Sequence, residues 1–345
     1  MSRSTIKEIA RLCGVSRATV SAVLHGKPWV SDETRRQVQR VLREQDYQKH
    51  LIDHTLSERF GKVIGVVLGN IRNPFNSELI TGLQEALSRR GFFTLQHTTD
   101  ESYEGEIEAI RALETYNLGG YVVAPVQEGQ PHDHLRAIRD SGKPLVSIGK
   151  VPDLETHVVD FDDQRASKET TDYLIGLGHR RIVCLAGPET SSFARHRILG
   201  FVESLMDHGL PFSDSSVLRA GATFTQGCEA ATEALSREDD RPTALLCFND
   251  LVAMGAYKAA YDLKVRIPDD LSIVGFDNSQ LSAVMGPPLT TVATWPSQVG
   301  QAAAEILLQA LDSPPPNGFL HRMTVPVLVE RASVRHAAEQ PASSV

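Results

Sequence analysis

The feature that most constrains this fold is an alternation between short apolar runs and helix-forming stretches that begins at residue 63. The first run, Val63–Leu68, contains no polar side chain, which is typical of a strand buried on both faces. The segments that follow predict, in order, a helix at 75–90, a strand at 92–96, a helix at 101–116, a strand at 120–124, a helix at 132–141 and a strand at 144–148. This order predicts a parallel sheet covered by helices.

The same alternation then starts again. The second series predicts helices at 165–177, 195–208, 226–236 and 251–262, and strands at 181–186, 244–248 and 271–276. We therefore expect two Rossmann-like halves, joined near residues 158–163, with a cleft between them. Open parallel sheets bind ligands beyond the carboxyl ends of their strands, so the loops there should face the cleft.

Ahead of this alternation, residues 5–24 predict a helix-turn-helix. Thr5 and Glu8 have capping-box spacing, and Gly14 suits the turn that ends the first helix. Ser16 can cap a second helix that exposes small or cationic side chains, which suits a DNA groove. The alternative is a helical hairpin that binds nothing. Ser31 is expected to cap a third helix that covers the first two.

The formal charge is divided unevenly along the chain. Residues 1–50 carry +5 and residues 51–345 carry −13, for a net charge of −8. A basic head on an acidic body fits phosphate contact confined to one end. There is no apolar stretch of about 18 residues and no apolar signal segment. We therefore expect no membrane contact, and a cytoplasmic, nucleoid-associated protein.

Enzyme signatures are missing from the sequence. It has no phosphate-cradling glycine loop, no G-x-S-x-G elbow and no metal-type grouping of histidines. The four cysteines are far apart and are expected to be reduced core thiols: Cys13, Cys184, Cys228 and Cys247. We expect no catalytic residue, no cofactor and no metal ligand. A sugar kinase fused to a DNA-binding head is the rival class, and turnover of a bound sugar would identify it.

Several motifs, in order, make the chain resemble LacI/GalR-type transcriptional repressors over about residues 5–332. They are IKEIARLCGVSRATVSAVL at 6–24, VSDETR at 30–35, IGVV at 64–67, NPF at 73–75, LGHRRI at 177–182, ARHRILGF at 194–201, FND at 248–250, IPDDLSIVGFD at 267–277 and PPLTTV at 287–292. The resemblance implies a homodimer whose affinity for operator DNA is controlled by a small effector, most often a sugar. The runner-up is a regulator that responds to a purine or nucleoside as co-repressor, or an activator.

The resemblance, combined with the pattern above, implies a small all-α helix-turn-helix domain followed by an α/β core. The core would comprise two Rossmann-like parallel-sheet subdomains, as in type I periplasmic binding proteins. The expected boundaries are 1–47 for the head, 48–60 for the hinge, 61–335 for the core and 336–345 for a disordered tail. Within the core we expect a first subdomain of about 61–160 plus 293–320, and a second of about 161–290 plus 321–335.

The resemblance also implies DNA contacts. Arg17 and Ala18 fall where the family reads bases, although a phosphate contact alone remains open for Arg17. Leu56 matches the minor-groove wedge of the hinge, whereas Asp53 puts an anion there. Ala22 replaces an arginine common in relatives on the recognition helix. The expected phosphate contacts are Thr5, Ser16, Thr19, Ser21, His25 and Ser31.

The implied effector contacts lie after strands or at helix starts. Phe75 would form an apolar wall against a sugar ring, with plain core packing as its alternative. Arg197 would fork to hydroxyls or a carboxylate, with a surface ion pair as its alternative. Asp250 is expected to cap the helix that follows Asn249. The full set of expected effector residues is Phe75, Asn76, Arg197, Phe224, Asn249, Asp277 and Trp295.

Overall fold

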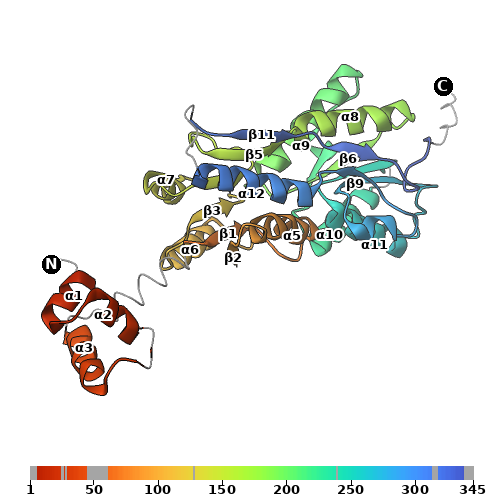
Figure 1. Cartoon of the computed structure of the whole chain (residues 1–345). Coiled ribbons are helices and arrows are strands. Elements are labelled where there is room, and N and C mark those ends of the chain that lie inside the picture. Colours follow the sequence, from red (N-terminus) through yellow and green to blue (C-terminus); the bar gives the residue numbers. More distant parts are fainter. Residues whose placement is uncertain are drawn as a thin grey trace, which may run out of the picture. The chain divides into compact units, whose positions relative to one another are not determined.

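The computed structural model describes residues 6–24, 27, 29–44, 61–126, 129–237, 240–312 and 318–337 (Figure 1). The chain divides into two compact units, Met1–Lys62 and Val63–Val345, and each is treated by itself. Three predicted features fall outside the described residues: the hinge at 48–60, residues 338–345 of the expected tail, and the site residues Thr5, His25 and Leu56.

The described part of the first unit contains three short helices, as the sequence predicts: α1 (Ile6–Cys13), α2 (Arg17–Leu24) and α3 (Asp32–Glu44). Their apolar faces meet in a core that includes the fully buried Ile9 and Val20. Because one face of α2 is buried in this core, its opposite face points to solvent.

Local hydrogen bonds form the turn and the caps of this head. Gly14 has a φ of 65°, and its N–H donates to Arg11 O at 3.3 Å, which ends α1. The hydroxyl of Ser16 accepts from Thr19 N at 3.1 Å, and that of Ser31 accepts from Thr34 N at 3.3 Å. The predicted caps of α2 and α3 are therefore confirmed.

The second unit contains two doubly wound subdomains, which confirms the predicted fold class. In the first, a six-stranded sheet of described residues has the order β11-β5-β4-β3-β1-β2, with every pair parallel. Its strands are β1 (Val63–Leu68), β2 (Phe93–Thr98), β3 (Gly120–Val123), β4 (Leu145–Ile148), β5 (His157–Phe161) and β11 (His321–Thr324). Its helices are α5 (Pro74–Ser88), α6 (Tyr103–Glu114), α7 (Asp133–Asp140) and α12 (Pro296–Asp312).

The apolar run of β1 is buried because helices cover both faces of this sheet. Ile64 and Val66 lie in a core shared with α5 and α12, whereas Val67 lies in a core shared with α6 and α7. Successive side chains of a strand point to opposite faces, so a strand covered on both sides has no position for a polar residue.

The second subdomain repeats this plan. Its sheet has the order β12-β10-β9-β8-β6-β7, and only the β10–β12 pair is antiparallel. Its strands are β6 (Ile182–Ala186), β7 (Val217–Arg219), β8 (Ala244–Cys247), β9 (Ser272–Asp277), β10 (Thr290–Ala293) and β12 (Val327–Val329). Its helices are α8 (Asp163–Gly176), α9 (Ser192–Asp207), α10 (Phe224–Leu235) and α11 (Asp250–Asp262), with 3₁₀ turns η1 (Asp214–Ser216) and η2 (Gln280–Ala283).

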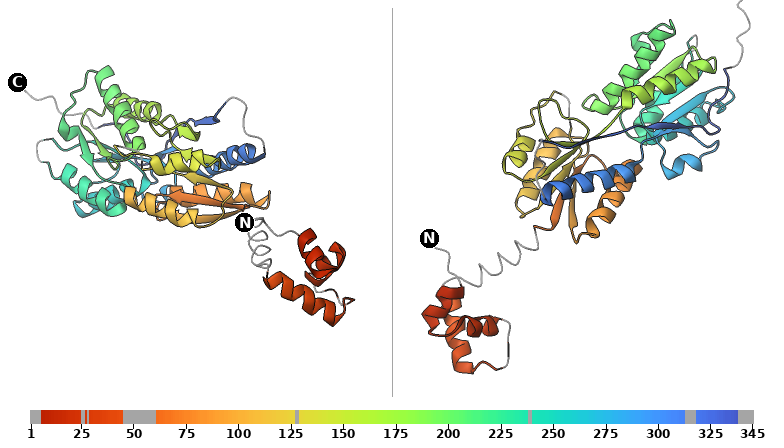
Figure 2. Two further views of the ribbon diagram at one scale, coloured as in Figure 1. Left: turned by 90° about the vertical axis from the view of Figure 1, so that its left-hand side faces the viewer. Right: turned by 45° about the horizontal axis from the view of Figure 1, so that its top comes forward.

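The chain passes between the subdomains three times in the described part, and Figures 1 and 2 let the reader follow these crossings from β5 to α8, from β10 to α12 and from β11 to β12. The last crossing falls later than the sequence suggests. Residues from 321 onward were expected in the second subdomain, yet β11 pairs with β5 in the first sheet. No described helix is long and apolar enough to cross a membrane.

Glycines allow the closest helix pairs to pack backbone against backbone. A Cβ on Gly300 of α12 would lie 2.0 Å from Leu79 O of α5, and one on Gly82 of α5 would lie 2.0 Å from Ser297 O. Neither neighbour is a flexible side-chain end that could move aside. Contact this close requires residues without a side chain.

We expect Gly300→Ala to lower the free energy of unfolding by about 1–3 kcal/mol, because α5 and α12 must separate to admit the methyl group. Gly176→Ala is the matched control, since a Cβ there meets nothing within 4 Å and its φ is not positive. That control should be neutral or stabilising by up to about 1 kcal/mol. Urea denaturation of both variants measures the difference, and equal effects would contradict the proposed packing.

Candidate functional site

The exposed face of α2 is the candidate surface on the first unit. Ser16, Arg17 and Ala18 are exposed, and Thr19 and Ser21 are partly exposed. The hydroxyls of Ser16 and Thr19 lie 2.8 Å apart. The face thus presents one guanidinium, one methyl group and small hydroxyls, which can approach a groove without steric conflict.

The structure also locates Ser31 and Ala22 in the head. Ser31 is exposed at the start of α3, where its hydroxyl caps the helix. Ala22, which replaces an arginine common in relatives, is only 5% exposed and lies in the head core. Ala22 packs in this core together with Val20 and Val23 of the same helix, so it lies on the buried face of α2.

The second unit contains a cleft between its subdomains, here named the central cleft. The space between its walls measures about 860 Å³, a volume that includes open solvent. The first subdomain contributes Gly69, Asn73, Phe75, Asn76, Glu101, Ala124, Pro125, Val126, Ile148 and Phe161. The second contributes Pro188, Thr190, Ser191, Ser192, Phe193, Arg197, Ala222, Phe248, Asn249 and Asp277. Most of these residues stand at or just after the carboxyl ends of strands, where open parallel sheets bind ligands.

Three aromatic rings form one side of the central cleft. Phe75 and Phe161 have ring centroids 6.0 Å apart, and Phe161 and Phe193 have centroids 5.6 Å apart at an interplanar angle of 82°. Phe193 belongs to α9, so the edge-to-face contact joins the two subdomains. Such a wall suits an apolar ring face of a ligand.

Arg197 lies in the second turn of α9 and is only 8% exposed. Its Nε lies 3.2 Å from Asp163 Oδ1, and its Nη1 donates to the carbonyl oxygen of Phe248. The guanidinium carbon sits 4.0 Å from the Phe276 ring centroid and 4.9 Å from that of Phe248. Arg197 therefore forms a buried ion pair with Asp163 and stacks on the rings of Phe248 and Phe276 at the wall of the cleft. It is not the surface ion pair considered as its alternative.

Asp163 holds this arginine from a fully buried position at the start of α8. Burial raises the pKa of the Asp163 carboxyl, and the nearby Arg197 guanidinium only partly opposes that rise. Among the described residues, Asp163 Oδ2 has no hydrogen-bond partner. Arg197 thus already has a carboxyl partner inside the protein before any ligand enters.

Two carboxyl groups line the central cleft, and neither forms an ion pair with another described residue. Burial raises the pKa of Asp277 well above its usual range, and burial together with Asp100 raises the pKa of Glu101. Both have positive φ values, 104° for Asp277 and 61° for Glu101. A Cβ on Gly69 would overlap the Glu101 carboxylate at 2.1 Å, so this glycine makes room for it. Strained backbone of this kind concentrates at ligand sites.

Asn249 lines the central cleft as expected, but the role expected for Asp250 is not the observed one. The cap of α11 is Asn249, whose Oδ1 accepts from Val252 N at 2.8 Å, so the cap predicted for Asp250 is wrong. Asp250 is instead buried and accepts from Thr291 Oγ1 at 2.6 Å and from Ser279 N at 2.7 Å. Burial raises its pKa to about 6 despite these bonds. Its hydrogen bond to Ser279 N therefore holds the loop after β9 in place.

The structure brings five of the predicted effector residues to the cleft: Phe75, Asn76, Arg197, Asn249 and Asp277. Phe224 is 45% exposed at the start of α10, and Trp295 is 40% exposed before α12; neither is among the residues that line the cleft. Glu101, Phe161, Phe193 and Phe248 line it but were not predicted. Phe248 directly precedes Asn249 in the F-N-D motif and could have been found; Glu101 stands in no motif.

Comparison with known proteins gives consistent matches to both units. Residues 61–325 match the family described as "Periplasmic binding proteins and sugar binding domain of LacI family", and residues 5–50 match "Bacterial regulatory proteins, lacI family". The chain is 32% identical to the HTH-type transcriptional regulator DegA of Bacillus subtilis, over 84% of this chain and 86% of DegA. It is 30% identical to the HTH-type transcriptional repressor PurR of Vibrio cholerae, over 96% and 98%. Among solved structures, the complex of the transcriptional regulator CelR with cellobiose has a TM-score of 0.72 at 26% identity, and the alignment covers 96% of this chain and 100% of CelR.

Proposed function

Because the chain belongs to the LacI family of bacterial transcriptional regulators, we propose that it is a homodimeric repressor whose operator affinity is set by a small effector in the central cleft. The observation that carries the regulatory part is that both subdomains supply the walls of the cleft. A ligand that contacts both walls favours one relative position of the subdomains over another, and only such a difference in affinity can shift an equilibrium.

The DNA-binding part of the proposal rests on α2. Arg17 would bridge the O6 and N7 acceptors of a guanine, and the methyl group of Ala18 would touch a thymine. Ser16, Thr19, Ser21 and Ser31 would contact phosphates, and the roles of Thr5, His25 and Leu56 stay predictions from the family pattern. A dimer would present two such helices to a pseudo-palindromic site. Acting on chromosomal operators, the protein would work in the cytoplasm at the nucleoid, as a regulator and not as an enzyme.

The chemistry of the central cleft points to a neutral, hydroxyl-rich effector. Among the described lining residues, Arg197 is the one with a positively charged side chain, and it is already paired with Asp163. Glu101 and Asp277 add two acidic groups to the lining. Asn76 and Asn249 add amide groups, and the Phe75–Phe161–Phe193 wall offers apolar surface. Hydroxyl donors suit such acceptors, and a sugar ring has both hydroxyls and an apolar face. The solved CelR–cellobiose complex is a sugar-bound relative. Sugars and the alternative effector class from the sequence, a purine or nucleoside, are therefore the two classes to compare.

Matched neutral and phosphorylated compounds test this assignment. The pairs are ribose with ribose 5-phosphate, glucose with glucose 6-phosphate, and cytidine with its monophosphate, with cellobiose and guanine added. We expect a neutral compound to raise the melting temperature of the full chain, by mass action on the folded state. Its phosphorylated partner should bind at least about tenfold more weakly, a difference of about 1.4 kcal/mol.

Glu101→Gln provides the control for this panel, because it removes the charge and keeps the shape. The preference for the neutral partner should shrink in that variant, since less negative charge then faces the phosphate. A phosphorylated compound that stabilises the wild type more than its neutral partner would overturn the assigned effector class, while leaving the DNA-binding part intact.

A further inference from the structure

A second cluster of polar side chains lies in the first subdomain, away from the residues proposed to contact the effector. One carboxylate oxygen of Glu106 and one ring nitrogen from each of His132 and His134 lie within 4.8 Å of one another. Glu106 belongs to α6, His132 precedes α7 and His134 lies in its first turn. Among the described residues, this group of one glutamate and two histidines has a geometry that could hold a metal ion. The sequence, from which no metal ligand was expected, does not reveal it because Glu106 comes from a different segment than the two histidines.

The burial of this cluster is unusual for such polar side chains. Glu106 is 0% exposed and His132 is 4% exposed, and the His134 side chain is 10% exposed. The two described hydrogen-bond partners of the Glu106 carboxylate are His134 Nε2 at 2.6 Å and Val126 N at 2.6 Å. Neither belongs to an arginine or lysine. A buried carboxylate is normally paired with a cation or bound to a metal, since an unbalanced buried charge is costly.

We propose that Glu106, His132 and His134 form a binding site for one divalent transition-metal ion, with Zn²⁺ as the natural occupant. One carboxylate and two imidazoles form a common zinc ligand set, and three protein ligands leave a fourth position for water. The Glu106–His134 contact would open from the observed 2.6 Å to about 3.3 Å, the spacing of neighbouring ligands around tetrahedral zinc. The other ligand atoms, which lie within 4.8 Å of one another, would reach the same spacing by side-chain rotation.

The site would act on the central cleft through one hydrogen bond. Glu106 Oε2 accepts from Val126 N, and Val126 lines the cleft together with Ala124 and Pro125. The Tyr103 hydroxyl donates to Pro131 O at 2.6 Å, which ties the start of α6 to the segment before His132. A metal ion would therefore hold α6, α7 and the loop after β3 together, and stabilise one wall of the cleft.

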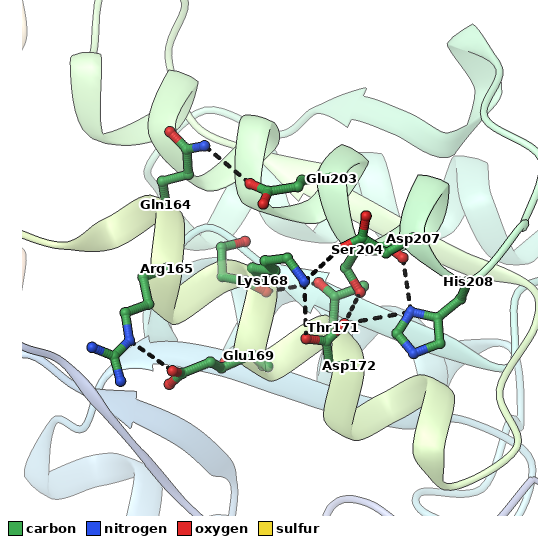
Figure 3. A network of polar contacts seen from close by, with 12 residues as sticks. Gln164, Arg165, Lys168, Glu169, Thr171, Asp172, Glu203, Ser204, Asp207 and His208 are labelled. Atoms are coloured by element: carbon green, nitrogen blue, oxygen red, sulfur yellow. Dashed lines mark hydrogen bonds and ion pairs between the residues drawn. The ribbon is translucent and has the colours of Figure 1, made fainter.

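Another histidine–carboxylate cluster provides the comparison within the same chain. His208 lies 3.5 Å from Asp172, but Lys168 already pairs with Asp172 at 3.4 Å and with Asp207 at 2.8 Å (Figure 3). Lys168 is only a quarter exposed and sits between these carboxylates. Lys168 of α8 thus already pairs with the carboxylates of Asp172 on α8 and Asp207 on α9. His208 therefore serves as a control that should not bind a metal.

Metal titration of the full, tag-free chain after treatment with a chelator tests the proposal. We expect one Zn²⁺ per chain by equilibrium dialysis, and Co²⁺ in the same site should show the visible bands of tetrahedral cobalt without a thiolate charge-transfer band. His134→Ala and Glu106→Gln should each weaken metal affinity by at least about tenfold, whereas His208→Ala should leave it unchanged. Circular dichroism shows whether each variant is folded, and His132→Ala replaces any that is not.

Binding of less than one ion per chain, or undiminished binding in folded His134→Ala and His132→Ala, would overturn the proposal. A Co²⁺ spectrum with thiolate bands would place the metal on cysteine and overturn it equally. In that case the hydrogen bond between Glu106 and His134 has only a structural role, joining α6 to α7.

Discussion

Arg197→Ala is expected to abolish the rise in melting temperature produced by the panel compound that stabilises the wild type best. The guanidinium lines the central cleft and is held in one orientation by Asp163, Phe248 and Phe276. An oriented guanidinium presents its hydrogen-bond donors in a fixed fork, so its loss removes both a bond and the geometry. Operator binding without ligand should remain, because Arg197 lies in the second compact unit and the residues proposed to contact DNA lie in the first.

The same variant should also lose stability. Removing Arg197 leaves the fully buried Asp163 without its cation, and breaking a buried pair in this way costs about 3–5 kcal/mol. Burial already raises the pKa of Asp163, and loss of Arg197 raises it further. A carboxyl whose pKa is raised in the folded state stabilises the fold most below its unfolded pKa, and that contribution is lost as pH rises through its folded pKa. The deficit of Arg197→Ala should therefore be smallest near pH 4 and grow toward pH 8.

The double variant Arg197→Ala/Asp163→Ala separates the two roles of the arginine. With both charges gone, much of the stability at pH 8 should return, whereas the ligand response should not. Denaturation curves at pH 4 and pH 8 give the first quantity, and ligand-induced shifts in melting temperature give the second. A double variant that regains the ligand response would show that Arg197 only supports the fold.

Arg17→Ala is expected to weaken binding to the operator by about 1–3 kcal/mol, while binding to random DNA changes little. The residue is exposed at the start of α2, where the head presents its small side chains. Loss of a bidentate contact to guanine removes specificity at one base pair. A phosphate contact, by contrast, contributes to any DNA sequence.

Arg11→Ala removes the same charge from α1, where Arg11 is also exposed. We expect this control to affect operator and random DNA alike. Fluorescence anisotropy with both DNAs at one fixed salt concentration measures the two variants, since these affinities depend strongly on salt. If Arg17→Ala weakens both DNAs equally, Arg17 contacts only phosphate.

Much of the fold follows from local patterns in the sequence. The apolar run of β1 and the glycine turn after α1 are decided by neighbours along the chain, and both appear in the structure where they were predicted. By contrast, β11 joins the first sheet by pairing with β5, about 160 residues earlier in the chain. A three- or four-residue strand has too little periodicity to reveal its partner.

The candidate cleft could be predicted only in part, for a similar reason. Asn249 and Asp277 follow strands inside recognisable motifs, so their position at the cleft could be inferred. Glu101 reaches the cleft because Gly69, on another loop, has no side chain to exclude it. The cap of α11 was assigned to Asp250 instead of Asn249 because both residue types can cap a helix, and only the tertiary contacts of Asp250 with Ser279 and Thr291 distinguish them.

The most direct test of the account is the operator affinity of the full chain with and without a ligand in the central cleft. The operator would first be selected from random-sequence DNA, where a dimer should enrich two inverted half-sites. The dissociation constant for that operator is then measured with and without a saturating concentration of the panel compound that stabilises the protein best. We predict a change of about 5- to 150-fold, the usual range of coupling between two sites. An unchanged constant, with the compound demonstrably bound, would contradict the account.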